Sequence, residues 1–223
     1  MSDYSDSVAV LSGELAAVEA CIAGLSSDDW ARTTKLDPFD ETAPRWTVKE
    51  LVAHIDISIG LTAALIDSAQ DGQTGRDRVS FFIANRNEVA PVVYDYAVGL
   101  AAEHTNESMA QKVSDTFAAT VEGASSNPPG LIGSGFFALM TLEEWVPTRT
   151  VEAVAHGMDL TNALERDPIA TPAGTAVTAA ILDELLARRT VAGRPADLDD
   201  DLAFIRAASG RGEHSDPRFP LIV

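Results

Sequence analysis

Two histidines and a glutamate have the residue types and spacing of a metal site. Glu152 and His156 are four residues apart, so on a helix their side chains lie on the same face, one turn from each other. His54 lies in the apolar segment LVAHIDIS, where leucine and isoleucine recur at helical spacing, which directs its imidazole towards a core. Two histidines and one carboxylate on two facing helices suit a divalent metal with one coordination position left open.

Each of these residues also has a simpler interpretation. Glu152 and His156 could form an ordinary ion pair on a helix surface, and His54 could be a core histidine with hydrogen-bond partners. If a metal is bound, we expect zinc; iron and nickel are alternatives because nitrogen and oxygen ligands discriminate weakly among such metals. The sequence contains no HExxH motif, glycine-rich phosphate loop, GxSxG motif or CxxC pair, which argues against several familiar enzyme classes.

Arg149 and Asp159 extend the polar stripe around Glu152 and His156. At about 100° per residue, all four fall within one arc of about 80° of a helix. The flanking positions are apolar, so this stripe runs along a helix that is otherwise suited to burial. We therefore expect Arg149 and Asp159 to bond to the metal ligands and orient them.

Helical periodicity dominates the chain and predicts the elements that must position these residues. The segment from Thr47 to Glu50 is a capping box that starts the helix carrying His54. Pro147 fits the first turn of the helix carrying Glu152 and His156, and Pro91 is expected to kink or divide an earlier helix. A short helix from Ser27 is also expected. The predicted longer helices cover about 8–22, 47–69, 79–104, 106–121, 147–166 and 175–190, and a second short helix is expected at about 198–208.

The fold class that follows is all-α. We expect a four-helix bundle over 1–167 and a small, mainly helical C-terminal extension over 168–223 that packs on the bundle. The apolar segment 131–145 has no assigned structure, and no run alternates convincingly as a strand does. With 46% hydrophobic residues, the 223-residue chain can build such a core.

Charge and composition exclude several classes of partner. The formal net charge of −18 repels phosphate backbones and anionic lipid headgroups, so we expect neither nucleic-acid nor membrane binding. The N-terminus lacks the basic start and apolar stretch of a signal peptide, and we expect a cytoplasmic protein. The expected partner is a small-molecule substrate, and a homodimer is a further expectation because bundles of this kind often dimerise.

Two motifs resemble those of a known family. Residues 46–54, WTVKELVAH, and 149–160, RTVEAVAHGMDL, with Trp30 upstream, resemble the DinB/YfiT-like superfamily of metal-binding helical bundles. The most similar branch is typified by mycothiol-dependent maleylpyruvate isomerase, and the resemblance covers about residues 8–165. It implies that His54, Glu152 and His156 are the three metal ligands. It also implies that the open metal position receives the thiol of mycothiol, as in related isomerases and thiol transferases.

The resemblance leaves the reaction open. A metal-held thiolate could add to an activated double bond or displace a leaving group, as an isomerase or S-transferase requires. Water in the same position would instead give a zinc hydrolase. A third alternative is a non-catalytic bundle that the metal braces and that binds a small ligand or partner. The isomerase branch also has a larger C-terminal domain, which supplies an arginine for substrate carboxylates; Arg211 is the candidate here for holding an anionic substrate.

Overall fold

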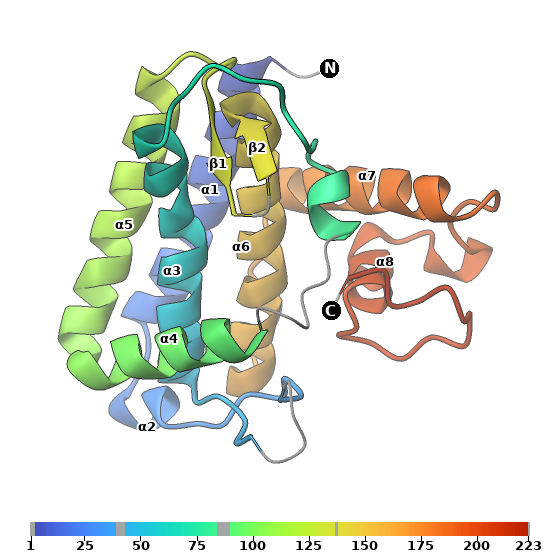
Figure 1. The fold of residues 1–223 in the computed structure, drawn as a ribbon. Coiled ribbons are helices and arrows are strands. Elements are labelled where there is room, and N and C mark those ends of the chain that lie inside the picture. Colours follow the sequence, from blue (N-terminus) through green and yellow to red (C-terminus); the bar gives the residue numbers. More distant parts are fainter. Residues whose placement is uncertain (1–2, 39–42, 84–89, 137, 223) are drawn as a thin grey trace.

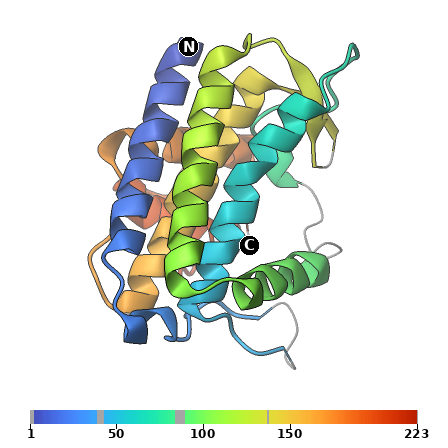
Figure 2. The same cartoon turned by 90° about the vertical axis from the view of Figure 1, so that its left-hand side faces the viewer.

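The structure is a computed structural model that describes residues 3–38, 43–83, 90–136 and 138–222. Four long helices lie side by side as a bundle (Figures 1 and 2). They are α1 (Tyr4–Ala23), α3 (Val48–Asp67), α5 (Asn106–Ser126) and α6 (Leu142–Leu164). Each contacts two others, because α1 and α3 both pack against α5 and α6. This arrangement confirms the predicted all-α fold.

The helix that carries His54 starts as predicted. The Thr47 hydroxyl accepts a hydrogen bond from the backbone N–H of Glu50, and the Glu50 carboxylate accepts one from the N–H of Thr47. This capping box satisfies two backbone donors that the first turn would leave without partners. The short helix α2 (Ser27–Trp30) is also confirmed and begins with a capping box of its own.

The helical stretch predicted over 79–104, which Pro91 was expected to kink or divide, contains two separate elements in the described residues. A short 3₁₀ helix, η1 (Ser80–Ile83), and α4 (Ala90–Glu103) occupy its two ends, and residues 84–89 lie outside the described part of the chain. Pro91 is the second described residue of α4. α4 crosses the end of the bundle and packs against α3 (Figure 1).

Residues 132–141 form a hairpin that periodicity did not predict. Strands β1 (Ile132–Gly135) and β2 (Ala138–Thr141) pair antiparallel. The hairpin lies on the end of α3, where the backbone N–H of Gln70 donates to the Ile132 carbonyl. A Cβ on Gly133 would lie 1.9 Å from the carbonyl oxygen of Leu65, so this close approach requires glycine. The residues that permit the contact are too small to produce an alternating apolar pattern.

The helix that carries Glu152 and His156 begins earlier than predicted. Thr141 caps α6, and its hydroxyl accepts a hydrogen bond from the N–H of Glu144. Pro147 therefore lies inside the helix and not in its first turn. Packing explains why the helix tolerates it, since α6 buries most of its residues between α1, α3 and α7.

The C-terminal part of the described chain packs on one side of the bundle. α7 (Pro172–Arg189) contacts α6 and α1, and α8 (Asp201–Ala208) packs on α7 after the 3₁₀ helix η3 (Ala196–Leu198). Figure 1 shows α7 projecting away from the bundle at a steep angle. The division expected at residue 167 falls in the connection between α6 and α7 and stays a prediction. Within the described ranges, every helix is too short or too polar to cross a membrane.

Candidate metal centre

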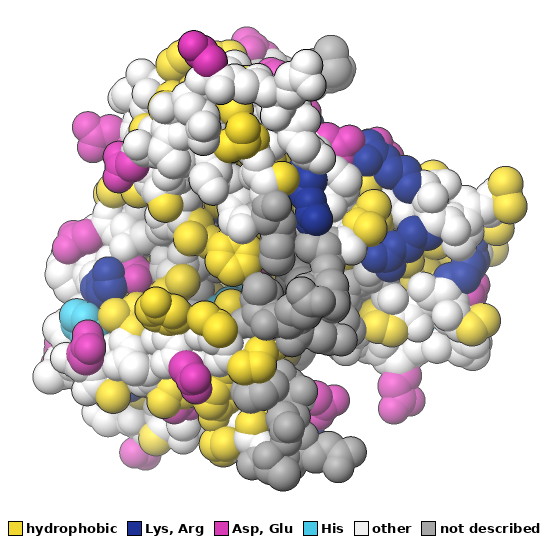
Figure 3. Space-filling model, in the orientation of Figure 1, with side chains coloured by type: hydrophobic (Ala, Val, Ile, Leu, Met, Phe, Trp, Pro, Cys, Tyr) yellow, Lys and Arg dark blue, Asp and Glu magenta, His cyan; other side chains and the backbone are white. Residues whose placement is uncertain are grey.

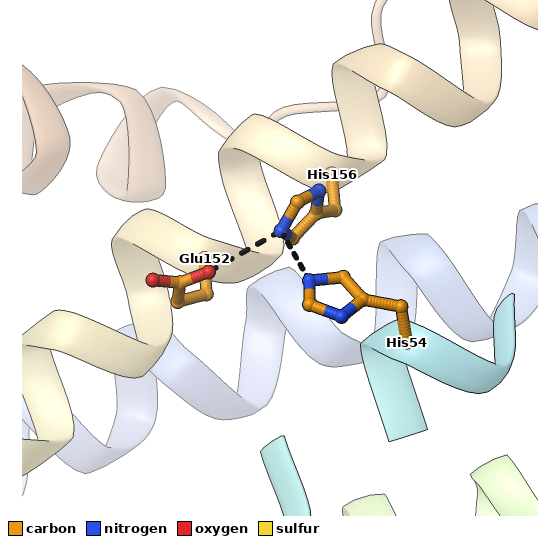
Figure 4. A group of neighbouring side chains, drawn as sticks. All are labelled: His54, Glu152 and His156. Carbon is orange, nitrogen blue, oxygen red and sulfur yellow. Dashed lines mark hydrogen bonds and ion pairs between the residues drawn. The ribbon is translucent and has the colours of Figure 1, made fainter. Parts of the chain in front are cut away.

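The structure brings His54, Glu152 and His156 together where α3 packs against α6 (Figure 4). The two Nε2 atoms of His54 and His156 are 3.0 Å apart, and Nε2 of His156 is 3.3 Å from Oε2 of Glu152. One potential ligand atom from each residue lies within 4.8 Å of the other two. These three residues, called the trio below, were inferred from sequences about a hundred residues apart.

The trio has the donor set and spacing of a metal site. Zinc binds histidine nitrogen and carboxylate oxygen at about 2.1 Å, so ligand atoms of a tetrahedral site are separated by about 3.4 Å. The separations of 3.0 and 3.3 Å are close to this value.

Asp159 fixes the orientation of His156. The two residues are one turn apart on α6, and Nδ1 of His156 lies 2.9 Å from Oδ2 of Asp159. A proton on Nδ1 leaves the lone pair of Nε2 directed at the trio, which is the state that a metal ligand needs. The contact expected between Asp159 and a metal ligand is therefore present.

Arg211 holds Asp159 in turn. Its Nε donates to Oδ1 of Asp159 over 2.7 Å, and its Nη2 donates to Oδ2 over 2.5 Å. The two residues thus form a bidentate ion pair that is almost completely buried. Arg211 was the candidate for binding a substrate carboxylate, whereas the carboxylate that it binds in the structure is that of Asp159. A role towards substrate stays a prediction.

These contacts shift two pKa values in opposite directions. Burial disfavours the charged form of His156, but the carboxylates of Asp159 and Glu152 outweigh it and raise the pKa of the imidazole. Burial also disfavours the ionised form of Asp159, but Arg211 and His156 outweigh it and lower the pKa of that carboxyl group. In the metal-free protein, His156 thus attracts a proton to the place where a cation would bind.

We expect the stabilisation given by a divalent metal to grow as pH rises. A metal must displace the proton that His156 holds, and this competition weakens with rising pH. Without metal, a histidine whose pKa is raised on folding stabilises the fold below its unfolded pKa, and this contribution is lost as pH rises through the raised value. The difference in Tm between zinc-loaded and metal-free protein should therefore widen from about pH 6 to about pH 8. A difference that stays constant or narrows would contradict this assignment.

Arg149 lines the same cavity as the trio and bonds to α3. Its guanidinium donates to the backbone carbonyl and hydroxyl of Ser58 on α3, over 2.8 and 3.0 Å, and its Cζ lies 4.1 Å from the centre of the Trp145 ring. Only 1% of the residue is exposed. Arg149 therefore joins α6 to α3 close to the metal ligands, and a direct role in orienting them stays a prediction.

A cavity of about 1160 Å³ opens over the trio. The trio and Asp159 form part of its lining, together with Arg149 and residues of α3, η1 and α4. Segment 209–213, which contains Arg211, lines another side. The cavity thus lies between the bundle and the C-terminal part of the chain, and its volume exceeds the range of about 300–1,000 Å³ typical of small-molecule pockets.

Comparison with protein families identifies the bundle. The model of the mycothiol maleylpyruvate isomerase N-terminal domain matches residues 11–161. The chain belongs to this family. The match contains the entire trio and confirms the resemblance carried by the two motifs around His54 and His156. No curated protein and no solved structure matches the chain.

Two parts of the site were missed by sequence reasoning. The centre of the Trp46 ring lies 4.9 Å from that of His54 and 5.9 Å from that of Tyr94 of α4, on which it stacks. These two aromatic rings therefore cover one side of His54. Trp46 was visible only as part of a family motif, and Tyr94 had no sequence signal. The pairing of Arg211 with Asp159 was also missed, because Arg211 lies beyond the residues that match the family.

Proposed function

We propose that this protein is a metal-dependent enzyme that uses a low-molecular-weight thiol, mycothiol or one similar to it, as an isomerase or S-transferase. The observation that carries the proposal is the trio, whose ligand atoms converge within 4.8 Å on the floor of the cavity. Membership of a family named for a mycothiol-dependent isomerase supports the choice of thiol.

The protein's own residues perform three tasks in this proposal. His54, Glu152 and His156 hold the ion and leave a coordination position facing the cavity. Asp159 keeps the proton of His156 on Nδ1, and Arg211 keeps Asp159 ionised. Trp46 and Tyr94 shield His54 from one side. A bound divalent ion would supply Lewis acidity, which lowers the pKa of a coordinated thiol and favours the thiolate near neutral pH.

The reaction class is addition of the thiol to an electrophilic carbon. In the isomerase, a carbon–sulfur bond forms at one end of an activated double bond, and the π electrons move towards the activating carbonyl group. Rotation about the resulting single bond and expulsion of the thiol then give the other geometric isomer, with no net change in atoms or electrons. In the S-transferase, the thiol proton ends on the neighbouring carbon or leaves with the displaced group.

Cobalt substitution tests the proposal directly. Titrating the cobalt-loaded protein with mycothiol should produce a sulfur-to-metal charge-transfer absorption, because the thiol sulfur coordinates the ion. S-methyl mycothiol, which has no ionisable thiol, is the matched control and should give no such band. Stoichiometric cobalt without any spectral response to mycothiol would refute thiol use and favour the hydrolase or the braced bundle.

A further inference from the structure

The cavity over the trio has an apolar wall that the metal chemistry does not use. Ile57 and Leu61 of α3 and Phe81 and Phe82 of η1 line it, and we call these four residues the apolar wall. Phe81 and Phe82 are almost fully buried, and their rings pack edge to face. A surface of this composition recognises an organic group by burial and not by hydrogen bonding.

The entrance to the cavity is apolar as well. Val92 and Tyr96 of α4 and Phe136 of the hairpin line it and are 55%, 68% and 47% exposed, and Ile83, next to Phe82, is 49% exposed. The other exposed large hydrophobic residue in the described ranges is Val191, which does not line the cavity. Figure 3 shows hydrophobic side chains gathered over and above α4. Exposed apolar side chains concentrated at one opening indicate a binding surface.

Phe136 supports this interpretation by its backbone. Its φ of 56° lies in the left-handed region, which a bulky side chain rarely adopts. Glycine or asparagine would occupy such a position with less strain. Half-exposed at the entrance, the Phe136 ring adds apolar surface there.

The charges in the cavity argue against a dianionic ligand. Among the described lining residues, three are lysine or arginine; Arg211 is ion-paired with Asp159, and Arg149 donates to the carbonyl of Ser58. The third, Lys35, is exposed to solvent. The acidic lining residues are Asp37, Glu152, Asp159 and Glu213. Acidic side chains therefore outnumber lysine and arginine side chains in the described lining, so a second carboxylate at a distance from the metal would gain little net attraction.

We propose that the second substrate is an electrophile with an apolar body, aromatic or alicyclic, and not a small dicarboxylate. Its reactive carbon lies at the trio, and its body extends along the apolar wall towards Val92 and Tyr96. The position of the reactive carbon rests on the proposed thiol function, whereas the preference for an apolar body rests on the cavity alone.

Two matched probes test this preference without turnover. 3-Phenylpropanoate and succinate each offer one carboxylate to the metal and differ only in carrying a phenyl ring or a second carboxylate at the other end. Binding to the zinc-loaded protein can be followed by tryptophan fluorescence, because Trp46 lines the cavity. Burial of a phenyl ring should make 3-phenylpropanoate bind at least about tenfold more tightly than succinate.

A pair of variants tests whether the preference for the phenyl ring arises at the entrance of the cavity. Val92→Asp and Val191→Asp introduce the same charge at exposed positions, one at the entrance and one outside the cavity. Val92→Asp should weaken 3-phenylpropanoate binding about fivefold or more, and Val191→Asp should leave it unchanged. Equal or tighter binding of succinate, no binding of 3-phenylpropanoate, or equal effects of the two variants would overturn the proposal. The cobalt titration with mycothiol is independent of these outcomes, so failure of the thiol function and failure of the apolar preference can be distinguished.

Discussion

Replacement of His156 by alanine should abolish stoichiometric metal binding. Elemental analysis of the purified parent protein should give about one equivalent of divalent metal, and the variant should retain almost none. His156 is the central residue of the trio, since its Nε2 faces both His54 and Glu152. Loss of a direct ligand should cost more than the roughly 10- to 100-fold that removal of an outer hydrogen-bond partner costs. His54→Ala should behave in the same way.

His104→Ala is the matched control for these variants. His104 follows α4, its ring lies against Ser108, and it does not line the cavity. The control should keep its full metal content, which excludes a general effect of removing a histidine. A parent protein that holds no metal under any loading condition would refute the metal site, and with it the proposed function.

Arg211→Met should weaken metal binding by about 10- to 100-fold although Arg211 does not touch the trio. Arg211 forms an ion pair with Asp159, and Asp159 hydrogen-bonds to the ring of His156. The substitution should therefore make the orientation of His156 less fixed, through Asp159. It should also lower the free energy of unfolding by about 3–5 kcal/mol, because the buried carboxylate of Asp159 loses its cationic partner. Metal titration and urea denaturation measure the two effects separately.

A double-mutant cycle with Asp159→Asn separates stability from orientation. In the double variant no uncompensated carboxylate remains, so much of the lost stability should return. Metal affinity should stay low, because the introduced amide holds His156 without a charge. Arg206→Met removes a partly buried arginine of α8 outside the cavity and should leave metal affinity unchanged. Full metal affinity in Arg211→Met would show that Asp159 orients His156 without help.

The parts of the fold with a local signal could be predicted from the sequence. Helical periodicity and the capping box at Thr47 placed the helix of His54, and the spacing of Glu152, His156 and Asp159 placed them on one face. The apolar positions that flank these residues on the helix predicted that this face is buried. The convergence of the two helices at one site required the family motifs, because periodicity alone does not determine which helices pack together.

The remaining features depend on contacts between distant segments. The hairpin exists because Gly133 fits against the backbone of Leu65, and that close contact leaves no alternating pattern. Pro147 indicated the wrong helix start because burial of α6 by its neighbours outweighs the local preference of proline. Arg211 lies in an irregular segment 52 residues beyond Asp159, so no helical spacing could reveal their ion pair.

The position of the cavity has a consequence for how activities diverge in this family. The metal trio and the apolar wall lie within the matched residues 11–161, whereas segment 209–213 closes another side from beyond them. Changes in segment 209–213 can reshape the cavity, and the ion pair of Arg211 with Asp159 connects this segment to His156 of the trio. Two proteins with the same trio can therefore differ in the molecules that their cavities admit.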